Sequence, residues 1–161
     1  MNDYELSPVQ DEDIGMMSRI HLLSFDDAWT GAMIRRILTM PGTFGIVARD
    51  RRHWTVSGFA LLRLAADECE VLSLAVAPER RGAGVGGLLF DGAIAQASGA
   101  GAEKLFLEVA EDNTVARSLY TGRGLAPVGR RPGYYLRKDG TKAAAVTMSC
   151  NLESLAIRTS A

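Results

Sequence analysis

The sequence has few cysteines and no excess of charge of either sign. Only 2 of its 161 residues are cysteine, and 19 acidic residues stand against 18 basic ones, which gives a net charge of −1. Cys69 and Cys150 form no Cys-x-x-Cys pair and have no histidine at metal-ligand spacing, so we interpret both as buried, reduced thiols. The balanced charge argues against duplex DNA as a partner, because DNA binding needs a clearly basic face.

Long apolar runs, internal repeats and linkers rich in proline or serine are also missing. No apolar run approaches the about 18 residues that a membrane span needs, and residues 1–6 lack the basic and apolar regions of a signal peptide. We therefore expect a cytoplasmic protein with no membrane partner. A chain of this length buries roughly 70% of its unfolded surface when it folds as one domain, so we predict a single domain over residues 1–151 and a C-terminal tail over residues 152–161.

The spacing of apolar residues predicts an α/β or α+β sheet domain with the element order β-α-α-β-β-β-α-β-α-β-β. Strands are predicted at residues 4–7, 44–49, 55–64, 68–76, 104–109, 125–131 and 143–151. Helices are predicted at residues 11–24, 30–40, 84–98 and 113–123. The strands between residues 44 and 76 are joined by short turns, which indicates an antiparallel meander.

Several local features accompany this prediction. The apolar spacing assigns these residues to the buried faces of the first two helices: Ile14, Met17, Ile20 and Leu23, then Met33, Ile34, Ile37 and Leu38. Gly124 follows a predicted helix where a left-handed residue is favoured. Turns are predicted at Pro132-Gly133 and at Asp139-Gly140. We interpret His21 and His53 as structural or surface residues.

Glycine is the residue present in excess. The chain has 17 glycines, and seven of them lie between residues 82 and 101. Four of these lie within residues 82–87, between a predicted strand and a predicted helix. Such a loop exposes backbone N–H groups at the positive end of the helix dipole, which suits a phosphate group.

Three phosphate-binding patterns compete for this loop. A P-loop is excluded, because Leu88 and Leu89 stand where lysine and serine or threonine are required. Gly82-x-Gly84-x-x-Gly87 fits a dinucleotide fingerprint, and Glu108 lies where its ribose-binding acid is expected. However, five residues separate the strand from Gly82, and too little chain follows for a Rossmann sheet. The third pattern is Arg81-x-x-Gly84-x-Gly86.

This third pattern resembles the (Gln/Arg)-x-x-Gly-x-(Gly/Ala) signature of the GCN5-related N-acetyltransferases. Over about residues 55–150, the chain resembles the ribosomal-protein alanine N-acetyltransferase branch of that superfamily. The resemblance extends through Leu105-Phe106-Leu107-Glu108-Val109, Asn113, the segment from Ala116 to Leu125, and the segment from Val128 to Tyr135. Leu125 replaces the usual phenylalanine, and Ala28 precedes Trp29 where proline is common in the branch.

The resemblance implies acetyl-CoA as co-substrate, with no metal. It implies that the backbone of Leu74, Ala75 and Val76 holds the pantetheine and that Asn113 binds the cofactor arm. The pyrophosphate would be bound by the amides of Gly82, Ala83, Gly84, Val85, Gly86 and Gly87. Glu108 is implied as general base and Tyr120 as the acid that protonates or stabilises the leaving thiolate.

The residues themselves add to this. In the strand 104–109, Glu108 points to the same side as Phe106 and away from Leu105, Leu107 and Val109. Asn113 and Tyr120 share one helix face. An α-amino group has a pKa of about 7.7–8.0 and is roughly a fifth to a third deprotonated at pH 7.4, whereas a lysine side chain near 10.4 is deprotonated in about one molecule per thousand. An N-terminal amine therefore needs only a modest base.

The sequence thus predicts an acetyltransferase that acts on the N-terminal alanine of a small-subunit ribosomal protein. Its partners would be that N-terminal peptide or another amine, with no direct contact to nucleic acid. Acetylation of a small amine, an antibiotic or a lysine side chain remains open, because the same loop serves all of them. A non-catalytic acyl-CoA-binding module and a Rossmann-type oxidoreductase are the alternatives from other classes.

Overall fold

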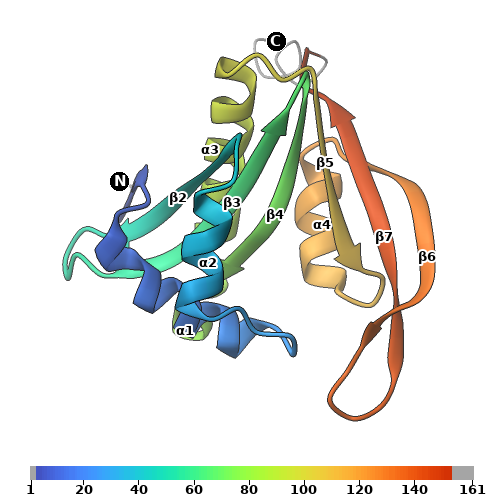
Figure 1. The fold of residues 1–161 in the computed structure, drawn as a ribbon, viewed down its shortest axis with the longest axis horizontal. Helices are drawn as coiled ribbons and strands as arrows, with labels where there is room; N and C mark the ends of the chain where they lie inside the picture. The colour runs from blue at the N-terminus through green and yellow to red at the C-terminus, as the bar shows by residue number, and fades with distance from the viewer. Residues whose placement is uncertain (1–2, 154–161) are drawn as a thin grey trace. The chain divides into compact units, whose positions relative to one another are not determined.

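The computed structural model describes residues 3–153. The elements follow in the order β1 (Tyr4–Pro8), η1 (Asp11–Asp13), α1 (Ile14–Ser24), α2 (Gly31–Leu38), β2 (Thr43–Asp50), β3 (Val56–Ala65), β4 (Glu68–Val76), η2 (Pro78–Arg80), α3 (Val85–Gly99), β5 (Lys104–Ala110), α4 (Thr114–Gly122), β6 (Ala126–Leu136) and β7 (Lys142–Asn151) (Figure 1). Here η1 and η2 are single 3₁₀ turns. Without them, the order is the one that the sequence predicts.

The described residues form two compact units. Residues 3–63 and 72–96 belong to unit 1, and residues 64–71 and 97–153 belong to unit 2. In the seven-stranded sheet, unit 1 holds the order β1-β2-β3-β4 and unit 2 the order β4-β5-β7-β6, so that β4 contributes to both. The sheet is mixed, because β4 and β5 run parallel, whereas β1–β2, β2–β3, β5–β7 and β6–β7 are antiparallel pairs. The predicted fold class is confirmed, and the extent of a single domain over residues 1–151 stays a prediction.

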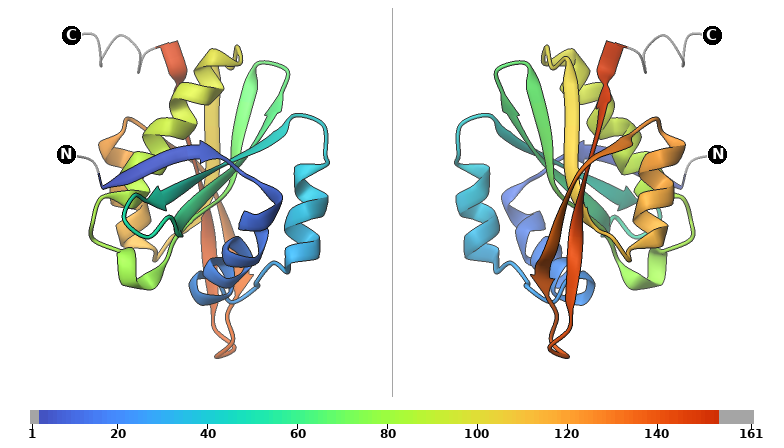
Figure 2. Two further views of the ribbon diagram at one scale, coloured as in Figure 1. Left: turned by 90° about the vertical axis from the view of Figure 1, so that its left-hand side faces the viewer. Right: turned by 90° about the vertical axis from the view of Figure 1, so that its right-hand side faces the viewer.

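In unit 1, the helices cover both faces of the strands (Figure 2). Val47, Phe59 and Leu61 point toward α1 and α2 and belong to their buried core. On the other face, a Cβ built on Gly58 would lie 2.9 Å from a methyl carbon of Leu89 in α3. Glycine at position 58 therefore lets α3 pack closely on β3.

The predicted buried faces of α1 and α2 need two corrections. Leu23 is 51% exposed and Met33 is 44% exposed, whereas Ile20 and Ile34 are buried. A residue turns about 100° along a helix, so a strict spacing of three drifts by about 60° at each step. Leu23 has drifted off the face that begins at Ile14, and His21 is buried in its place.

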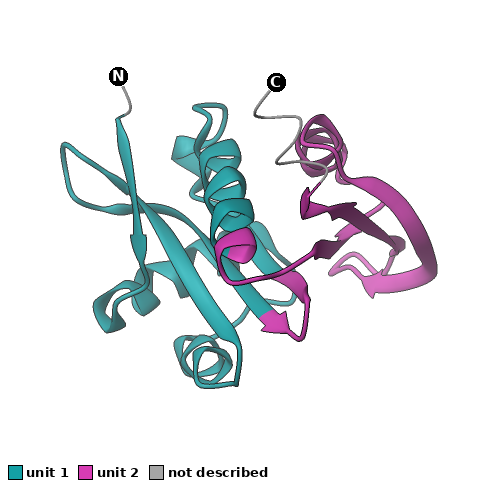
Figure 3. Cartoon of the chain, turned by 90° about the horizontal axis from the view of Figure 1, so that it is seen from above, with its two compact units in different colours: residues 1–63, 72–96 teal, residues 64–71, 97–161 magenta. Residues whose placement is uncertain are grey.

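Unit 2, magenta in Figure 3, is built around β5. This strand pairs parallel with β4, from Glu68↔Lys104 to Val71↔Leu107, and antiparallel with β7 along its whole length. Strand β6 pairs with β7 and forms the outer strand of the unit. After β7, the buried Leu152 donates its N–H to Glu103 O at 2.9 Å. The rest of the predicted tail, residues 154–161, lies outside the described residues.

The predicted turn at Pro132-Gly133 is wrong. Strand β6 runs through both residues, and the register shifts between Arg131↔Ala145 and Tyr135↔Ala143. Three residues, 132–134, thus stand opposite Ala144 alone, and Gly133 adopts a φ of 61°. Proline is tolerated in an outer strand and at a bulge because no ladder hydrogen bond from its nitrogen is needed there.

The chain reversal lies at the second predicted turn, Asp139-Gly140. There the N–H of Arg137 donates to Thr141 O at 2.8 Å, and Gly140 has a φ of 86°. The Asp139 carboxylate accepts from the backbone N–H and the hydroxyl of Thr141. Gly124 also has the predicted positive φ, of 94°.

Neither cysteine forms a disulfide. Cys69 and Cys150 pair with Leu105 from opposite sides, so their strands lie two strand spacings apart, about 9.6 Å. That separation exceeds the about 7 Å that a disulfide spans. Cys69 is buried and Cys150 is half-buried, and burial raises the pKa of the Cys150 thiol.

Candidate active site

The glycine loop lies in unit 1, between η2 and α3. Gly82 has a φ of 79° and Gly84 a φ of 85°, backbone conformations that favour glycine. A Cβ built on either residue would meet nothing within 4 Å. Backbone conformation, and not crowding, therefore accounts for these two glycines, and the space beside them is open. Gly86 and Gly87 lie in the first turn of α3.

The amides at the start of α3 form a donor group. Leu88 N is the first helical donor, to Gly84 O at 3.0 Å. The N–H groups of Val85, Gly86 and Gly87 precede it and have no acceptor within the helix. They lie at the positive end of a 15-residue helix. This arrangement fits a phosphate or pyrophosphate group.

Two adjacent arginines hold the chain in front of this loop. Arg81 donates through Nε to Val76 O and through Nη2 to Ser24 Oγ, both at 3.1 Å. Arg80 forms an ion pair with the buried Asp50, with 2.7 Å between Nη2 and Oδ2. The pKa of Asp50 is lowered, first by the hydrogen bond from the backbone N–H of Arg52. Arg81, the first residue of the signature, thus links the loop to β4 and α1.

The predicted pantetheine-binding residues lie at the end of β4. Ala75 is buried among the core residues of α1 and α2, while Leu74 and Val76 are half-buried. A Cβ on Gly58 would lie 2.9 Å from Ala75 O, which shows how closely β3 approaches this strand. The role of these residues toward a cofactor stays a prediction.

Glu108 lies in unit 2, on β5. Leu105, Leu107 and Val109 are buried, whereas Glu108 is on the other face, with 23% of its side chain exposed. The predicted orientation is confirmed. One carboxylate oxygen, Oε1, lies 3.0 Å from Nη2 of Arg131 in β6. This cation and the partial exposure offset the cost of placing a charge on a central strand.

Tyr120 is 7% exposed, near the C-terminal end of α4. Burial raises the pKa of its phenol to about 12. The hydroxyl therefore carries its proton throughout the neutral range and is able to donate a hydrogen bond. Tyr120 O also accepts from the N–H groups of Arg123 and Leu125, both at 3.1 Å, which closes the end of the helix.

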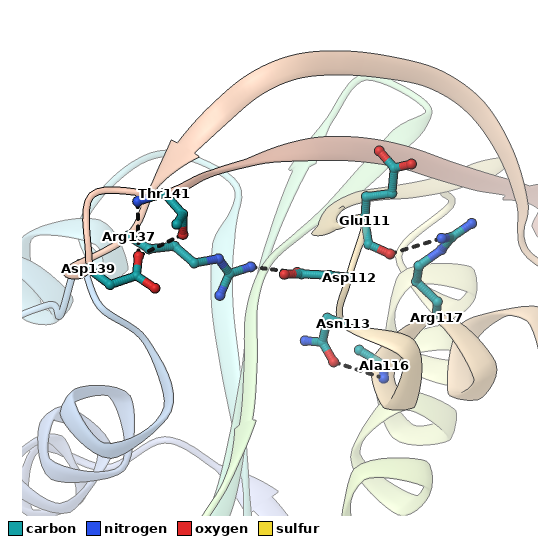
Figure 4. Close-up of polar contacts among 8 residues, drawn as sticks. All are labelled: Glu111, Asp112, Asn113, Ala116, Arg117, Arg137, Asp139 and Thr141. Atoms are coloured by element: carbon teal, nitrogen blue, oxygen red, sulfur yellow. Dashed lines mark hydrogen bonds and ion pairs between the residues drawn. The ribbon is translucent and has the colours of Figure 1, made fainter.

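Asn113 is the N-cap of α4, as Figure 4 shows. Its Oδ1 accepts from Ala116 N at 3.2 Å. The side chain is exposed, and its Nδ2 amide group is directed to no acceptor among residues 3–153. Capping uses only the acceptor of this side chain, so the donor remains for a carbonyl oxygen of a ligand.

Three arginines contact the two residues that precede Asn113, and the sequence did not predict these contacts. Arg117 donates to Glu111 O at 2.9 Å, and Arg137 pairs with Asp112 (Figure 4). Arg130 pairs with the Glu111 carboxylate, with 2.7 Å between Nε and Oε2. The segment between β5 and α4 is thereby held from the helix and from the β6–β7 hairpin. The partners of Arg130 and Arg137 are 19 and 25 positions away, so no local pattern could indicate these two pairs.

A shallow hollow of about 410 Å³ was also missed. It is lined by one face of α4, with the residues Thr114, Arg117, Ser118, Thr121 and Gly122. These residues recur at helical spacing and are small or hydroxylated apart from Arg117. The hollow is open, and its first lining residue, Thr114, directly follows Asn113.

His21 has a structural role. It is 3% exposed, and its Nδ1 accepts the N–H of Trp29 at 2.9 Å while the two rings stack at 4.6 Å. Burial lowers the pKa of His21 to about 4. The exposed His53 lies 3.6 Å from Asp50. Within residues 3–153, no group of three or more metal-binding side chains could hold a metal ion, and no helix is long and apolar enough to span a membrane.

This loop and fold match a known family. The model of the acetyltransferase (GNAT) family matches residues 14–125. That match covers more than half of the chain, so the chain belongs to the GNAT acetyltransferase family. The family resemblance predicted from Arg81, Gly84 and Gly86 is confirmed.

The more similar relatives share one name. A [ribosomal protein bS18]-alanine N-acetyltransferase from Haemophilus influenzae is 37% identical over 97 residues, which are 60% of this chain and 66% of that protein. A Bacillus subtilis protein to which the same name is provisionally given is 30% identical over 125 residues, which are 77% of this chain and 82% of that protein. Among solved structures, the ribosomal-protein-S18-alanine N-acetyltransferase from Escherichia coli superposes with a TM-score of 0.85 at 21% identity, over 92% of this chain and 94% of that one. This last likeness concerns the fold.

Proposed function

We propose that this protein transfers the acetyl group of acetyl-CoA to the α-amino group of an N-terminal alanine, and that its acceptor is a small-subunit ribosomal protein. The observation that carries the proposal is Glu108, a partly exposed carboxylate on a central strand whose residues 105–110 are otherwise apolar. The names of the relatives from Haemophilus influenzae and Bacillus subtilis support the choice of acceptor.

Unit 1 supplies the groups that bind the co-substrate. The free amides of Val85, Gly86 and Gly87 donate to the pyrophosphate, together with those of Gly82, Ala83 and Gly84, which the positive φ angles of the two glycines hold in place. The backbone of Leu74, Ala75 and Val76 pairs with the pantetheine arm as an added strand would. The family resemblance implies that Asn113 also binds this arm, and its Nδ2 would donate to a carbonyl oxygen there.

Glu108 takes the proton of the attacking amine, directly or through a water. An α-amine with a pKa of about 7.8 needs only about 0.5 kcal/mol to lose its proton at pH 7.4, whereas a lysine near 10.4 needs about 4 kcal/mol. A carboxylate is a weak base, so it suits the first of these acceptors. The neutral amine then attacks the carbonyl carbon of the thioester, the C–S bond breaks, and the nitrogen of the new amide releases its second proton to solvent.

Tyr120 stabilises the thiolate that leaves. Full proton transfer from a phenol with a pKa of about 12 to a thiolate, whose thiol form has a pKa of about 8.5, is uphill by about 3.5 pKa units, or roughly 5 kcal/mol. A hydrogen bond from the neutral phenol to the sulfur avoids most of this cost. Tyr120 therefore acts first as a donor, and the thiolate takes its proton later from solvent.

A panel of acceptors tests the proposal. Release of free thiol from acetyl-CoA is measured with a peptide that begins with alanine, an N-blocked peptide that contains lysine, and a polyamine. We expect the alanine peptide to be preferred by at least tenfold in kcat/KM. Preference for the blocked peptide or the polyamine would contradict the ribosomal assignment and favour the small-amine or lysine alternative. No turnover with any acceptor, despite acetyl-CoA binding, would favour a non-catalytic module.

The role of Glu108 is tested by Glu108→Gln. The amide keeps the size of the side chain but cannot take a proton, so kcat falls at least tenfold while the dissociation constant for acetyl-CoA stays within twofold. Glu111→Gln is the matched control, since Glu111 also pairs with an arginine of β6 but lies beyond the end of β5. Equal activity of the Glu108→Gln variant and the wild type would refute the role.

A further inference from the structure

The surroundings of Glu108 hold one charged group that the proposed reaction does not use. Arg131 lies within 3.0 Å of Oε1 of Glu108. It is a side chain of β6, so its contact with β5 spans the intervening strand β7. This reach has a structural explanation in the register of the strands.

The register places both side chains on one face of the sheet. Glu108 stands opposite Thr147 of β7, and Thr147 stands opposite Gly129 of β6, so the three share a face. Arg131 follows Gly129 by two residues and therefore points the same way. Arg131 stands opposite Ala145, whose small side chain lies on the same face of β7.

The bulge of β6 adds aromatic contacts to Arg131. Its guanidinium carbon lies 5.2 Å from the ring centre of Tyr134, within cation–π range. Tyr134 meets Tyr135 edge to face at 5.1 Å. Tyr135 pairs with Ala143, two residues before the partner of Arg131, so it returns to the face of Glu108. Burial, and then the negative charge of Glu108, raise the pKa of Tyr135.

The carboxylate is thus held on one side only. The ion pair of Glu108 is made through Oε1, with Arg131, and 23% of the Glu108 side chain is exposed. A carboxylate offers about four lone-pair sites on its two oxygens. The contact of Arg131 with Oε1 fixes the rotation of the carboxylate and thereby the direction of Oε2, which can accept a hydrogen bond from an incoming donor.

We propose that Arg131 is a positioning residue, which fixes Oε1 of Glu108 so that Oε2 faces the acceptor amine. This inference rests on the proposed role of Glu108. In the reaction, the amine N–H donates to Oε2, the proton moves to that oxygen, and the amine nitrogen keeps the electron pair with which it attacks. Arg131 stays on Oε1 and exchanges no proton.

Arg130 provides a matched control. It is the neighbouring residue on β6, its side chain is 56% exposed against 60% for Arg131, and it pairs with Glu111 at 2.7 Å. It points to the opposite face. Arg130→Gln and Arg131→Gln thus each remove one exposed ion pair from the same strand, and only the second alters the surroundings of Glu108.

The test compares these variants on the alanine peptide. Arg131→Gln lowers kcat by about threefold to tenfold, a range set by the modest strength of an exposed pair, and leaves both KM values within twofold. Arg130→Gln keeps kcat within twofold. In a double-mutant cycle, adding Arg131→Gln to Glu108→Gln causes no further loss, because Arg131 acts through that carboxylate. Equal effects of the two arginine variants, or losses that multiply with Glu108→Gln, would overturn the inference.

An NMR measurement of the Arg131–Glu108 contact separates this inference from the proposed function. In the arginine side-chain NMR spectrum, Glu108→Gln shifts the Nε–H signal of Arg131 and leaves that of Arg130 in place. An unmoved Arg131 signal would refute the pairing whatever the activity. A shifted signal in a protein that acetylates no amine would leave the pairing intact and refute the proposed function instead.

Discussion

Replacing Tyr120 with phenylalanine removes one hydroxyl from a buried position. The side chain is 7% exposed, and phenylalanine keeps its ring. The substitution therefore leaves the packing of α4 nearly unchanged. What it removes is the hydrogen bond that we propose to stabilise the leaving thiolate.

The expected loss follows from the strength of that bond. A hydrogen bond to a charged group contributes about 1.5–3 kcal/mol, and each 1.36 kcal/mol corresponds to about tenfold in rate. The kcat of Tyr120→Phe should therefore fall by about 10-fold to 150-fold. The acetyl-CoA dissociation constant should not change, because the thiolate exists only after the C–S bond begins to break.

The pH dependence adds a second readout. Since burial raises the pKa of Tyr120 to about 12, only about 1% of the phenol is ionised at pH 10. Ionisation of Tyr120 should therefore not lower the wild-type kcat between pH 8 and pH 10. Any decline of kcat in this range should be the same in the wild type and in Tyr120→Phe. Thiol release at saturating acetyl-CoA measures both quantities. A fall of less than threefold in kcat, or a basic limb below pH 10 that disappears in the variant, would refute the reasoning.

Three further outcomes follow from the structure. Gly84→Ala should raise the KM for acetyl-CoA by about fivefold or more, because a φ of 85° costs a residue with a Cβ about 1–2 kcal/mol. Gly99→Ala is the control, since a Cβ at position 99 meets nothing within 4 Å. Equal KM values for the two variants would contradict the prediction. His21 has a folded pKa of about 4, below its unfolded value near 6.5, so its contribution to stability is complete above pH 6.5 and is lost as the pH falls toward 4. Urea unfolding should show a loss of about 2–3 kcal/mol over that range, and His21→Gln should reduce it. For Tyr120, whose folded pKa is raised, stability should decline as the pH rises from 10 to 12, by up to about 2.7 kcal/mol, and a wild type that follows Tyr120→Phe throughout this range would show that burial does not shift the phenol.

Local sequence patterns predicted the features that depend on neighbouring residues. The alternation along residues 104–109 placed Glu108 opposite Leu107, because side chains of a strand alternate whatever the strand pairs with. The left-handed Gly124 was predicted from its place after a helix. The glycine loop was predicted because its positive φ angles and its unpaired amides belong to one short segment.

Features that depend on register could not be predicted in this way. A proline followed by glycine favours a turn, but pairing with β7 on both sides keeps residues 132 and 133 within β6 as a bulge. Arg131 and Glu108 are 23 positions apart, and their contact depends on the pairing of β5 with β7 and of β7 with β6. No local pattern contains that information.

The choice of acceptor follows from the base more than from the cofactor loop. The loop amides donate to a phosphate group and carry no information about the amine, so the same loop is compatible with peptides, polyamines and lysines. Glu108 differs in this respect, because it is the group that we propose to take the proton of the amine, and a carboxylate is a weak base. Such a base suits an amine whose pKa lies near 7.8 and serves poorly for one near 10.4, since the difference costs roughly 3.5 kcal/mol at neutral pH. Raising the pH from 7.4 to 9 should therefore narrow the preference for the alanine peptide over the lysine peptide, because a larger share of the lysine side chain becomes neutral. An unchanged preference would show that the acceptor is selected by contacts rather than by the ionisation of its amine.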